Sequence, residues 1–222
     1  MQKLPKPKII YEDNHLLVVE KPANIPVQED SSKDIDMLTI LKTYRKKNEN
    51  KQGEAFIGLV HRLDRPVSGI MVFAKTSKAA SRLSDQIRQN TFHKTYLAVI
   101  QGTLPSSGDF EDYLIKNEKE NKSYVTTKEK GKYSKLEYKV LDTKNNLSLV
   151  EINLITGRSH QIRVQFSSRN HPLIGDSKYG NNTNNIDIAL LAKSITFNHP
   201  TTKEPLTFTL EIPNKYPFNI FK

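Results

Sequence analysis

The chain has 222 residues, with 34 Lys and Arg against 24 Asp and Glu, which gives a formal net charge of +10. Hydrophobic residues make up 36% of the chain. No cysteine is present, and this absence excludes disulfides, thiolate metal sites and cysteine nucleophiles and fits a cytoplasmic location. No apolar run reaches the roughly 18 residues that a membrane helix needs, so we expect no membrane association. The positive charge favours a polyanionic partner such as nucleic acid, although it also fits a merely well-solvated surface.

The N-terminal part is predicted to contain short strands and one helix. β-rich runs at 9–11 and 16–20 flank an Asp-Asn turn. Ser31 or Ser32 could cap a helix over 34–48, where apolar residues recur at helical spacing. The basic tail of this helix is interpreted as a solvated end rather than a phosphate-binding edge.

The middle of the chain is predicted to present a polar turn between two strands. Strands over 56–60 and 70–75 flank the segment HRLDRPVSG, residues 61–69, whose proline and Ser-Gly pair indicate a turn. Ser77 can cap the next helix, which has apolar residues on one face. The segment HKTYLAVIQG, residues 93–102, then predicts a strand that ends at a glycine.

The following region is rich in lysine. Residues 116–139 contain eight Lys against four Glu and few apolar residues, which indicates a flexible hairpin or an inserted loop. Alternating apolar residues over 135–141 and 147–154 then predict a β-hairpin around a Lys-Asn-Asn turn.

The C-terminal part is predicted to contain a third helix and two final strands. Gly157 breaks the chain, and Ser159 is expected to cap a helix over 160–168. The last strands are expected over 188–197 and 206–212.

Together these elements predict an α+β fold, with a mixed, mostly antiparallel central sheet and flanking helices, in a single domain over 1–222. There is no GxGxxG motif and no Walker loop, so no nucleotide cofactor has a visible cradle. The histidines form no pair with metal-ligand spacing, and we expect neither a metal nor a cofactor.

Asp64 is the first candidate for chemistry, because it lies where a strand gives way to a turn. Arg62 and Arg65 flank it and would favour its ionised form, which can act as a nucleophile or a base. Taken alone, a loop-capping aspartate is the simpler interpretation of this residue.

Arg158 and Arg163 surround the predicted start of the third helix. Free backbone N–H groups beside Arg158 would form an anion site there. Arg163 lies among apolar residues, so it is expected to be partly buried beside an acid, for which Asp64 is one candidate. A helix arginine at the solvent edge fits the same spacing.

Tyr96 alternates with Lys94 and Ala98 along the predicted strand, so all three side chains point to one face of the sheet. Tyr96 could stack on a base or exchange a proton there, although an ordinary core tyrosine is the simpler interpretation of the pattern alone.

The motifs taken together resemble the RluA-type family of pseudouridine synthases, over residues 8–213. HRLDRPVSGIMVFAKT is similar to the central motif of that family, FHKTYLAVIQG to the second and TGRSHQIRVQF to the third. The segments IIYEDNHLLVVEKPANIPV, HPLIGDSKYG and SITFNHP are also similar to family segments. The departures are Val67, Gln165 and Leu191, where threonine, histidine and histidine are frequent in the family.

The resemblance implies the pseudouridine synthase catalytic fold and the isomerisation of a uridine in transfer or ribosomal RNA. It implies that Asp64 is the nucleophile, that Tyr96 lines the pocket and that Arg163 pairs with Asp64. Arg62 would fill the space left in the RNA when the uridine flips out.

Further RNA contacts are assigned to His61, Arg65 and Arg158. Many relatives carry an RNA-binding domain of the S4 type before the catalytic domain, and we expect none here. The partner is RNA and the protein is expected to be a monomer.

Two other classes of protein remain alternatives. A non-catalytic RNA-binding protein with the same fold would bind RNA without changing it. A carboxylate hydrolase would need a second acid, for which Asp176 is the one candidate in these motifs, although it is interpreted here as a turn residue.

Overall fold

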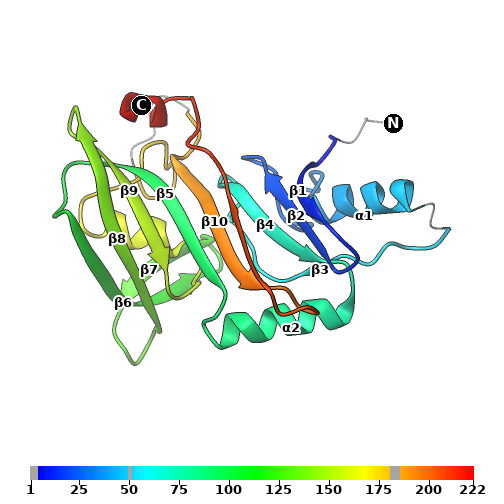
Figure 1. Cartoon of the computed structure of the whole chain (residues 1–222). Coiled ribbons are helices and arrows are strands. Elements are labelled where there is room, and N and C mark those ends of the chain that lie inside the picture. The colour runs from blue at the N-terminus through cyan, green and yellow to red at the C-terminus, as the bar shows by residue number, and fades with distance from the viewer. Residues whose placement is uncertain (1–4, 50–51, 181–185) are drawn as a thin grey trace. The chain divides into compact units, whose positions relative to one another are not determined.

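A computed structural model describes residues 5–49, 52–180 and 186–222. The chain divides into two compact units, Met1–His93 with Ser194–Leu210, and Lys94–Lys193 with Glu211–Lys222. Each unit is built on a β-sheet, and the residues of β10, Leu190–Asn198, are divided between the two (Figure 1). Within the described ranges no helix is long and apolar enough to cross a membrane.

The sheet of the first unit has the strand order β1-β2-β4-β10, with β3 beside β4 and β11 beside β10. The bounds of its strands are Lys8–Glu12 for β1, Leu16–Lys21 for β2, Gly58–Leu59 for β3, Ser68–Ala74 for β4 and Pro205–Thr209 for β11. The pairs β1–β2, β2–β4, β3–β4 and β10–β11 are antiparallel.

Two helices belong to this unit, α1 over Met37–Asn48 and α2 over Ser77–Arg88. Figure 1 shows α2 lying beside β3, and its buried Ala79 and Leu83 join a core cluster with Val18, Val72 and Phe197. The predicted caps were wrong by a few residues. Asp36 caps α1 instead of Ser31 or Ser32, and Thr76 caps α2 instead of Ser77, because each accepts a hydrogen bond from the backbone N–H three residues later.

The sheet of the second unit has the order β10-β5-β9-β8-β6-β7. Its other strands are β5 over His93–Gln101, β6 over Ser107–Asn117, β7 over Lys122–Thr126, β8 over Lys132–Lys144 and β9 over Leu147–Leu154. The pairs β5–β9, β8–β9, β6–β8 and β6–β7 are antiparallel. The α+β fold with a mostly antiparallel sheet is therefore confirmed.

The lysine-rich region forms a hairpin, which was one of the two alternatives predicted for it. Residues 116–139 contain the end of β6, all of β7 and the first part of β8, and β7 pairs antiparallel with β6, so the alternative of an inserted loop was wrong. The predicted hairpin of β8 and β9 is confirmed, and Asn145 and Asn146 both have the positive φ that a tight hairpin turn requires.

The helix α3, Gln161–Ser167, packs against β6 and β7. Its Phe166 ring contacts Phe110 and Tyr138 at centroid distances of 5.0 and 6.1 Å. Ser159 does not cap this helix, which was a wrong prediction. His160 stands at the cap position with φ of 53° and makes no side-chain capping bond. A short 3-10 helix, Phe218–Phe221, ends the chain.

Candidate active site

Asp64 lies in the first unit, on the turn between β3 and β4. The Val67 N–H donates to the Asp64 carbonyl at 3.0 Å, which closes the turn. Leu63 and Val67 are buried and hold the turn against the rest of the first unit, while Asp64 itself is only partly buried. The carboxylate is therefore presented on a closed turn rather than on a freely moving loop.

Lys21 ties this turn to the end of β2. Its side chain is fully buried, and its Nζ donates to the carbonyls of Pro22, Ile25 and Arg65 at 2.9, 2.7 and 2.9 Å. The Asn24 N–H also donates to the Arg65 carbonyl at 2.9 Å. Two donors thus fix the backbone immediately after Asp64.

The charge of Lys21 is set by the same surroundings. Burial lowers the pKa of its ammonium to about 8, the Asp64 carboxylate opposes this shift, and the Arg65 guanidinium adds to it. Lys21 was missed from the sequence, because a lysine at the end of an apolar strand is usually solvated.

The other charged residues of this turn differ in their partners. Arg62 is exposed, and its guanidinium has no hydrogen-bond or ion-pair partner within the described ranges. Arg65 contacts Asp34 directly and donates to Ser32 Oγ at 2.9 Å, and its Nη1 lies 3.8 Å from Asp30. Arg62 is therefore open to a ligand, whereas Arg65 is already engaged by two acids.

His61 is partly buried and packs within the first unit. Its Nε2 accepts the Val72 N–H at 3.2 Å, and its ring lies 5.5 Å from the Phe92 ring. These contacts anchor His61 to β4, so its predicted role in RNA binding stays a prediction.

In the second unit Tyr96 is buried on β5, opposite Ile152 of β9. Its exposed fraction is 6%, so only a small part of the side chain reaches the surface. The strand position and face are those predicted from the alternation of β5.

Arg163 has a carboxylate partner in its own unit. Its Nε and Nη2 donate to the two Asp176 oxygens at 2.8 and 2.7 Å, and both residues are buried. Burial of Asp176 opposes its ionisation, but the Arg163 guanidinium and the N–H groups of Lys178 and Tyr179 keep the pKa of the carboxyl below its usual value. The predicted Arg163–Asp64 pair joins residues of different units and stays a prediction.

Asp176 is therefore more than the turn residue it was taken for. It does accept the Lys178 and Tyr179 N–H groups at 2.9 and 3.0 Å, as a turn residue would. Its pairing with Arg163 was missed, because thirteen residues separate the two and local sequence patterns do not reveal such a contact.

Tyr179 connects this turn to its neighbours. Its hydroxyl accepts the Ser123 N–H of β7 at 2.6 Å and lies 2.8 Å from His160 Nδ1. Its ring has Arg163 and Lys122 each 5.1 Å from the centroid. Cations close to the ring face at both positions favour this orientation of the tyrosine.

Arg158 lies on an ordered turn before α3. Its N–H donates to Gln161 Oε1 at 2.9 Å and its Nε donates to the Tyr133 carbonyl at 2.8 Å. The Arg158 N–H is therefore not free to bind an anion at the predicted site, because Gln161 already accepts its hydrogen bond. The remaining guanidinium nitrogens of Arg158 stay on an exposed side chain.

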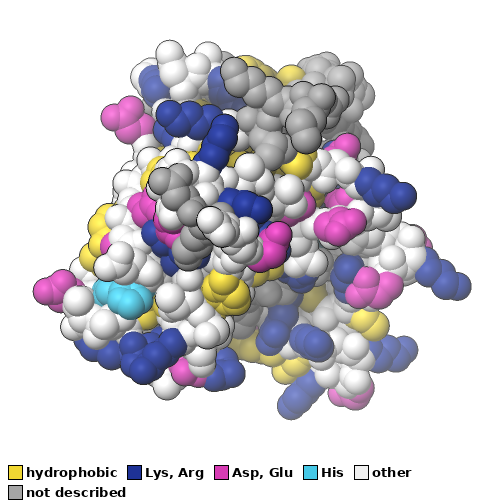
Figure 2. All heavy atoms as spheres, turned by 90° about the vertical axis from the view of Figure 1, so that its right-hand side faces the viewer, with side chains coloured by type: hydrophobic (Ala, Val, Ile, Leu, Met, Phe, Trp, Pro, Cys, Tyr) yellow, Lys and Arg dark blue, Asp and Glu magenta, His cyan; other side chains and the backbone are white. Residues whose placement is uncertain are grey.

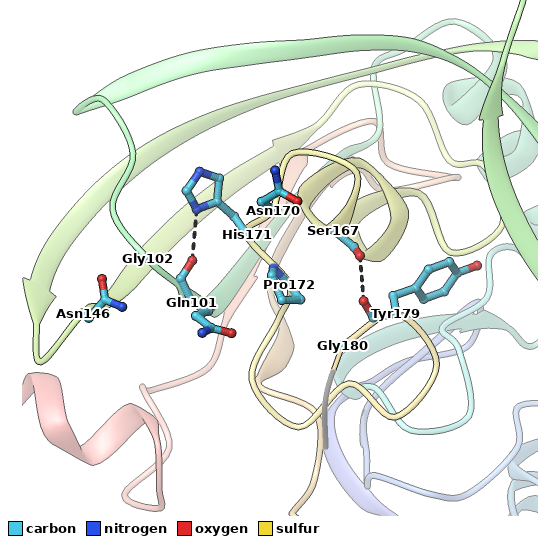
Figure 3. A pocket seen from close by; sticks show the side chains of 9 residues that line it. All are labelled: Gln101, Gly102, Asn146, Ser167, Asn170, His171, Pro172, Tyr179 and Gly180. Atoms are coloured by element: carbon cyan, nitrogen blue, oxygen red, sulfur yellow. Dashed lines mark hydrogen bonds between the residues drawn. The ribbon is translucent and has the colours of Figure 1, made fainter. Parts of the chain in front are cut away.

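A polar pocket of about 380 Å³ lies elsewhere in the second unit (Figure 3). Gln101, Asn146, Ser167, His171 and Tyr179 are among the residues that line it, and it contains none of the predicted site residues. Figure 3 shows His171 Nδ1 next to the Gln101 carbonyl, at 3.0 Å, and Ser167 Oγ donating to the Tyr179 carbonyl at 2.6 Å. Some of the polar groups that line the pocket thus already form hydrogen bonds within the protein.

The charge on one face of the molecule is dispersed. Figure 2 shows Lys and Arg side chains spread over this face, with Asp and Glu side chains among them. Within the described residues, no group of three or more His, Asp and Glu side chains could hold a metal ion.

Comparison with known proteins gives one family. The family model described as RNA pseudouridylate synthase matches residues 15–168, more than half of the chain. Ribosomal large subunit pseudouridine synthase C of Buchnera aphidicola subsp. Baizongia pistaciae is 34% identical over 212 residues, which cover 90% of this chain and 65% of the relative. The protein of the same name from Vibrio vulnificus is 35% identical over 207 residues, which cover 89% of this chain and 63% of the relative.

The chain thus spans less than two thirds of the length of these two relatives.

Two solved structures share the fold. Human RNA Pseudouridylate Synthase Domain Containing 4 has a TM-score of 0.80 at 22% identity, with 96% of this chain and 92% of that chain covered. Human RNA Pseudouridylate Synthase Domain Containing 1 has a TM-score of 0.78 at 23% identity, with 97% and 87% covered. On the family match and the identity to these relatives, the chain belongs to the RNA pseudouridylate synthase family.

Proposed function

We propose that this chain isomerises specific uridines in ribosomal RNA, transfer RNA or both to pseudouridine, with Asp64 as the nucleophile. The observation that carries the proposal is the tethered position of Asp64. Its turn is closed by Val67, and the carbonyl of the next residue accepts hydrogen bonds from Lys21 and Asn24. A reactive group held in one position lowers the entropic part of the barrier.

The reaction needs no group donor. The N1–C1′ bond of the uridine breaks, the uracil turns, a C5–C1′ bond forms, C5 loses its proton and N1 gains one. Product and substrate have the same atoms, so an ionised carboxylate and a means of holding the base suffice in principle. In our proposal Asp64 supplies the carboxylate and no cofactor is used.

Three other residues receive roles in substrate binding. Arg62 would enter the RNA where the uridine has flipped out, which fits its exposure and its lack of a partner in the described ranges. Tyr96 would stack on the flipped base, a contact worth roughly 1–3 kcal/mol. Arg163 would hold Asp64 in its ionised form, and its bidentate pairing with Asp176 would keep the guanidinium plane fixed.

His61, Arg65 and Arg158 are proposed to add RNA contacts. Arg158 keeps guanidinium nitrogens on an exposed side chain for this purpose. Arg65 would have to exchange its contacts with Asp30 and Asp34 for a phosphate. We further propose that the protein acts as a monomer in the cytoplasm.

The names of the relatives suggest which RNA to test first. Both relatives described above are named for the large ribosomal subunit. We therefore propose large-subunit ribosomal RNA as the first substrate to examine, with transfer RNA as the second.

The hydrolase alternative finds little support in the surroundings of Asp176. A second catalytic acid must be able to reach the substrate or its attacking water. The exposed fraction of Asp176 is 1%, and its oxygens accept from Arg163, Lys178 and Tyr179. This carboxylate is committed to the interior of the protein.

The proposal is tested by incubating the protein with unmodified ribosomal and transfer RNA, digesting the RNA to nucleosides and separating them by chromatography. We expect pseudouridine to appear as uridine falls, with the RNA strands intact. Free uracil or shortened strands would indicate a hydrolase instead, and unchanged nucleosides with RNA bound would indicate a non-catalytic binding protein.

A further inference from the structure

Lys94 is a charged residue of the second unit that the proposed reaction does not yet use. It lies on β5 two residues before Tyr96, so the two side chains leave the same face of the sheet. Two residues of a strand span about 6.6 Å, a short distance for two groups that contact one ligand. The intervening Thr95, paired with Asn153, points to the opposite face.

The side chain of Lys94 reaches the turn that precedes α3. A Cβ added at Gly157 would lie 3.4 Å from Lys94 Nζ, the one heavy atom within 4 Å of it outside Gly157 and its chain neighbours in the described residues. The ammonium therefore lies against Gly157, next to Arg158. Two cationic side chains thus border the same short turn.

This ammonium differs from other lysines of its unit. Lys135 pairs with Glu111 at 2.7 Å and Lys215 with Asp187 at 3.0 Å, whereas Lys94 Nζ has no hydrogen bond or ion pair within the part of the chain that the structure describes. Lys94 is partly buried, and burial lowers the pKa of its ammonium. A desolvated charge without a counter-ion destabilises the folded protein, so an arriving anion would relieve this cost.

We propose that Lys94 binds a backbone phosphate of the substrate RNA, next to the uridine whose base stacks on Tyr96. The inference rests on the proposed function, from which it takes the RNA and the role of Tyr96. A lysine ammonium is a compact point charge that suits a phosphate oxygen. Arg158 at the same turn would contact the same phosphate or its neighbour.

Salt dependence of RNA binding tests this site. The Asp64→Asn protein is used as the background, so that the RNA is not converted, and a short oligouridylate is the probe. Lys94→Met keeps the length of the side chain without its charge, and Lys94→Arg keeps the charge. Lys78→Met is the matched control, because Lys78 is an exposed lysine of α2 without a described partner.

We expect Lys94→Met to weaken binding roughly tenfold and to lower the slope of log K against log salt by about 0.7, the value for one lost phosphate contact on a single strand. Lys78→Met should leave the slope unchanged, and Lys94→Arg should keep most of it. An unchanged slope and affinity in Lys94→Met would overturn the proposal.

Unfolding measurements separate this role from a structural one. Removal of an unpaired, desolvated charge should leave the free energy of unfolding of Lys94→Met equal to or above that of the wild type. A loss of stability in Lys94→Met, with Lys94→Gln behaving alike, would mean that Lys94 acts in folding and would overturn the proposal.

The binding measurement and the pseudouridine assay described above can fail independently of each other. If the wild type forms no pseudouridine but the slope still falls in Lys94→Met, the phosphate contact stands and the isomerase proposal fails. If pseudouridine forms and the slope is unchanged, the isomerase proposal stands and the Lys94 contact fails.

Discussion

Arg163 and Asp176 form a buried bidentate ion pair, with Nε–Oδ2 and Nη2–Oδ1 distances of 2.8 and 2.7 Å. The pair links α3 to the turn that carries Tyr179, whose ring lies against the Arg163 guanidinium. An arginine at a candidate active site is thus held in place from within its own unit. The pair has a direct consequence for stability.

Asp176→Asn should lower the free energy of unfolding by about 3–5 kcal/mol, because it leaves the Arg163 charge buried without its counter-ion. Urea denaturation measures this change. The double variant Asp176→Asn with Arg163→Met should lose less than the sum of the two single changes. A loss below 1 kcal/mol in Asp176→Asn would show that the pair contributes little to folding.

Arg62→Ala should lower kcat/KM on structured RNA at least tenfold, because nothing then compensates the few kcal/mol needed to flip the uridine. Its free energy of unfolding should change by no more than about 0.5 kcal/mol, since Arg62 is exposed. Steady-state kinetics and urea denaturation provide the two numbers. Unchanged kinetics at native stability would contradict the role assigned to Arg62.

Asp34→Asn should strengthen RNA binding a few-fold at low salt, because it frees Arg65 from one of its two acids. The pair is exposed and screened by solvent, so we expect the substitution to leave the free energy of unfolding almost unchanged. Asp85→Asn is the matched control, since Asp85 is an acid of α2 that pairs with Arg88. An equal gain from Asp85→Asn would attribute the effect to net charge rather than to Arg65.

The pH dependence of stability should report the buried Lys21. Burial lowers its folded-state pKa to about 8 from 10.5, so between these values the unfolded chain binds more protons and stability rises with pH. The free energy of unfolding of the wild type minus that of Lys21→Met should therefore increase across this range, by up to about 3 kcal/mol. A difference that is constant or shrinks between pH 8 and 10.5 would contradict the assigned pKa.

Most strands could be predicted because apolar residues alternate along them, as in β5 and in the hairpin of β8 and β9. Local patterns failed where several residues compete for one role. Asp36 lies only a few residues after Ser31 and Ser32, and any of the three could have capped α1. In β7 the lysines concealed a strand that is defined by its pairing with β6.

The candidate site shows the same division. The positions of Asp64 and Arg62 on a turn and of Tyr96 on a strand face could be predicted, because turn chemistry and strand alternation are local properties, whereas their roles were implied only by the family resemblance. Lys21 could not, since its importance lies in reaching the Arg65 carbonyl forty-four residues away. The observed partner of Arg163 could likewise not be found from short-range patterns, although Asp176 had been named as a possible second acid of a hydrolase.

Tritium release from RNA labelled at C5 of uridine tests the central claim most directly, since pseudouridine formation expels the C5 hydrogen. Wild type and Asp64→Asn would be compared on ribosomal and transfer RNA, after equal stability is established for both. The account predicts release by the wild type and none by Asp64→Asn. Equal release from both would show that the chemistry has been assigned to the wrong residue, and no release by the wild type with RNA bound would contradict the isomerase itself.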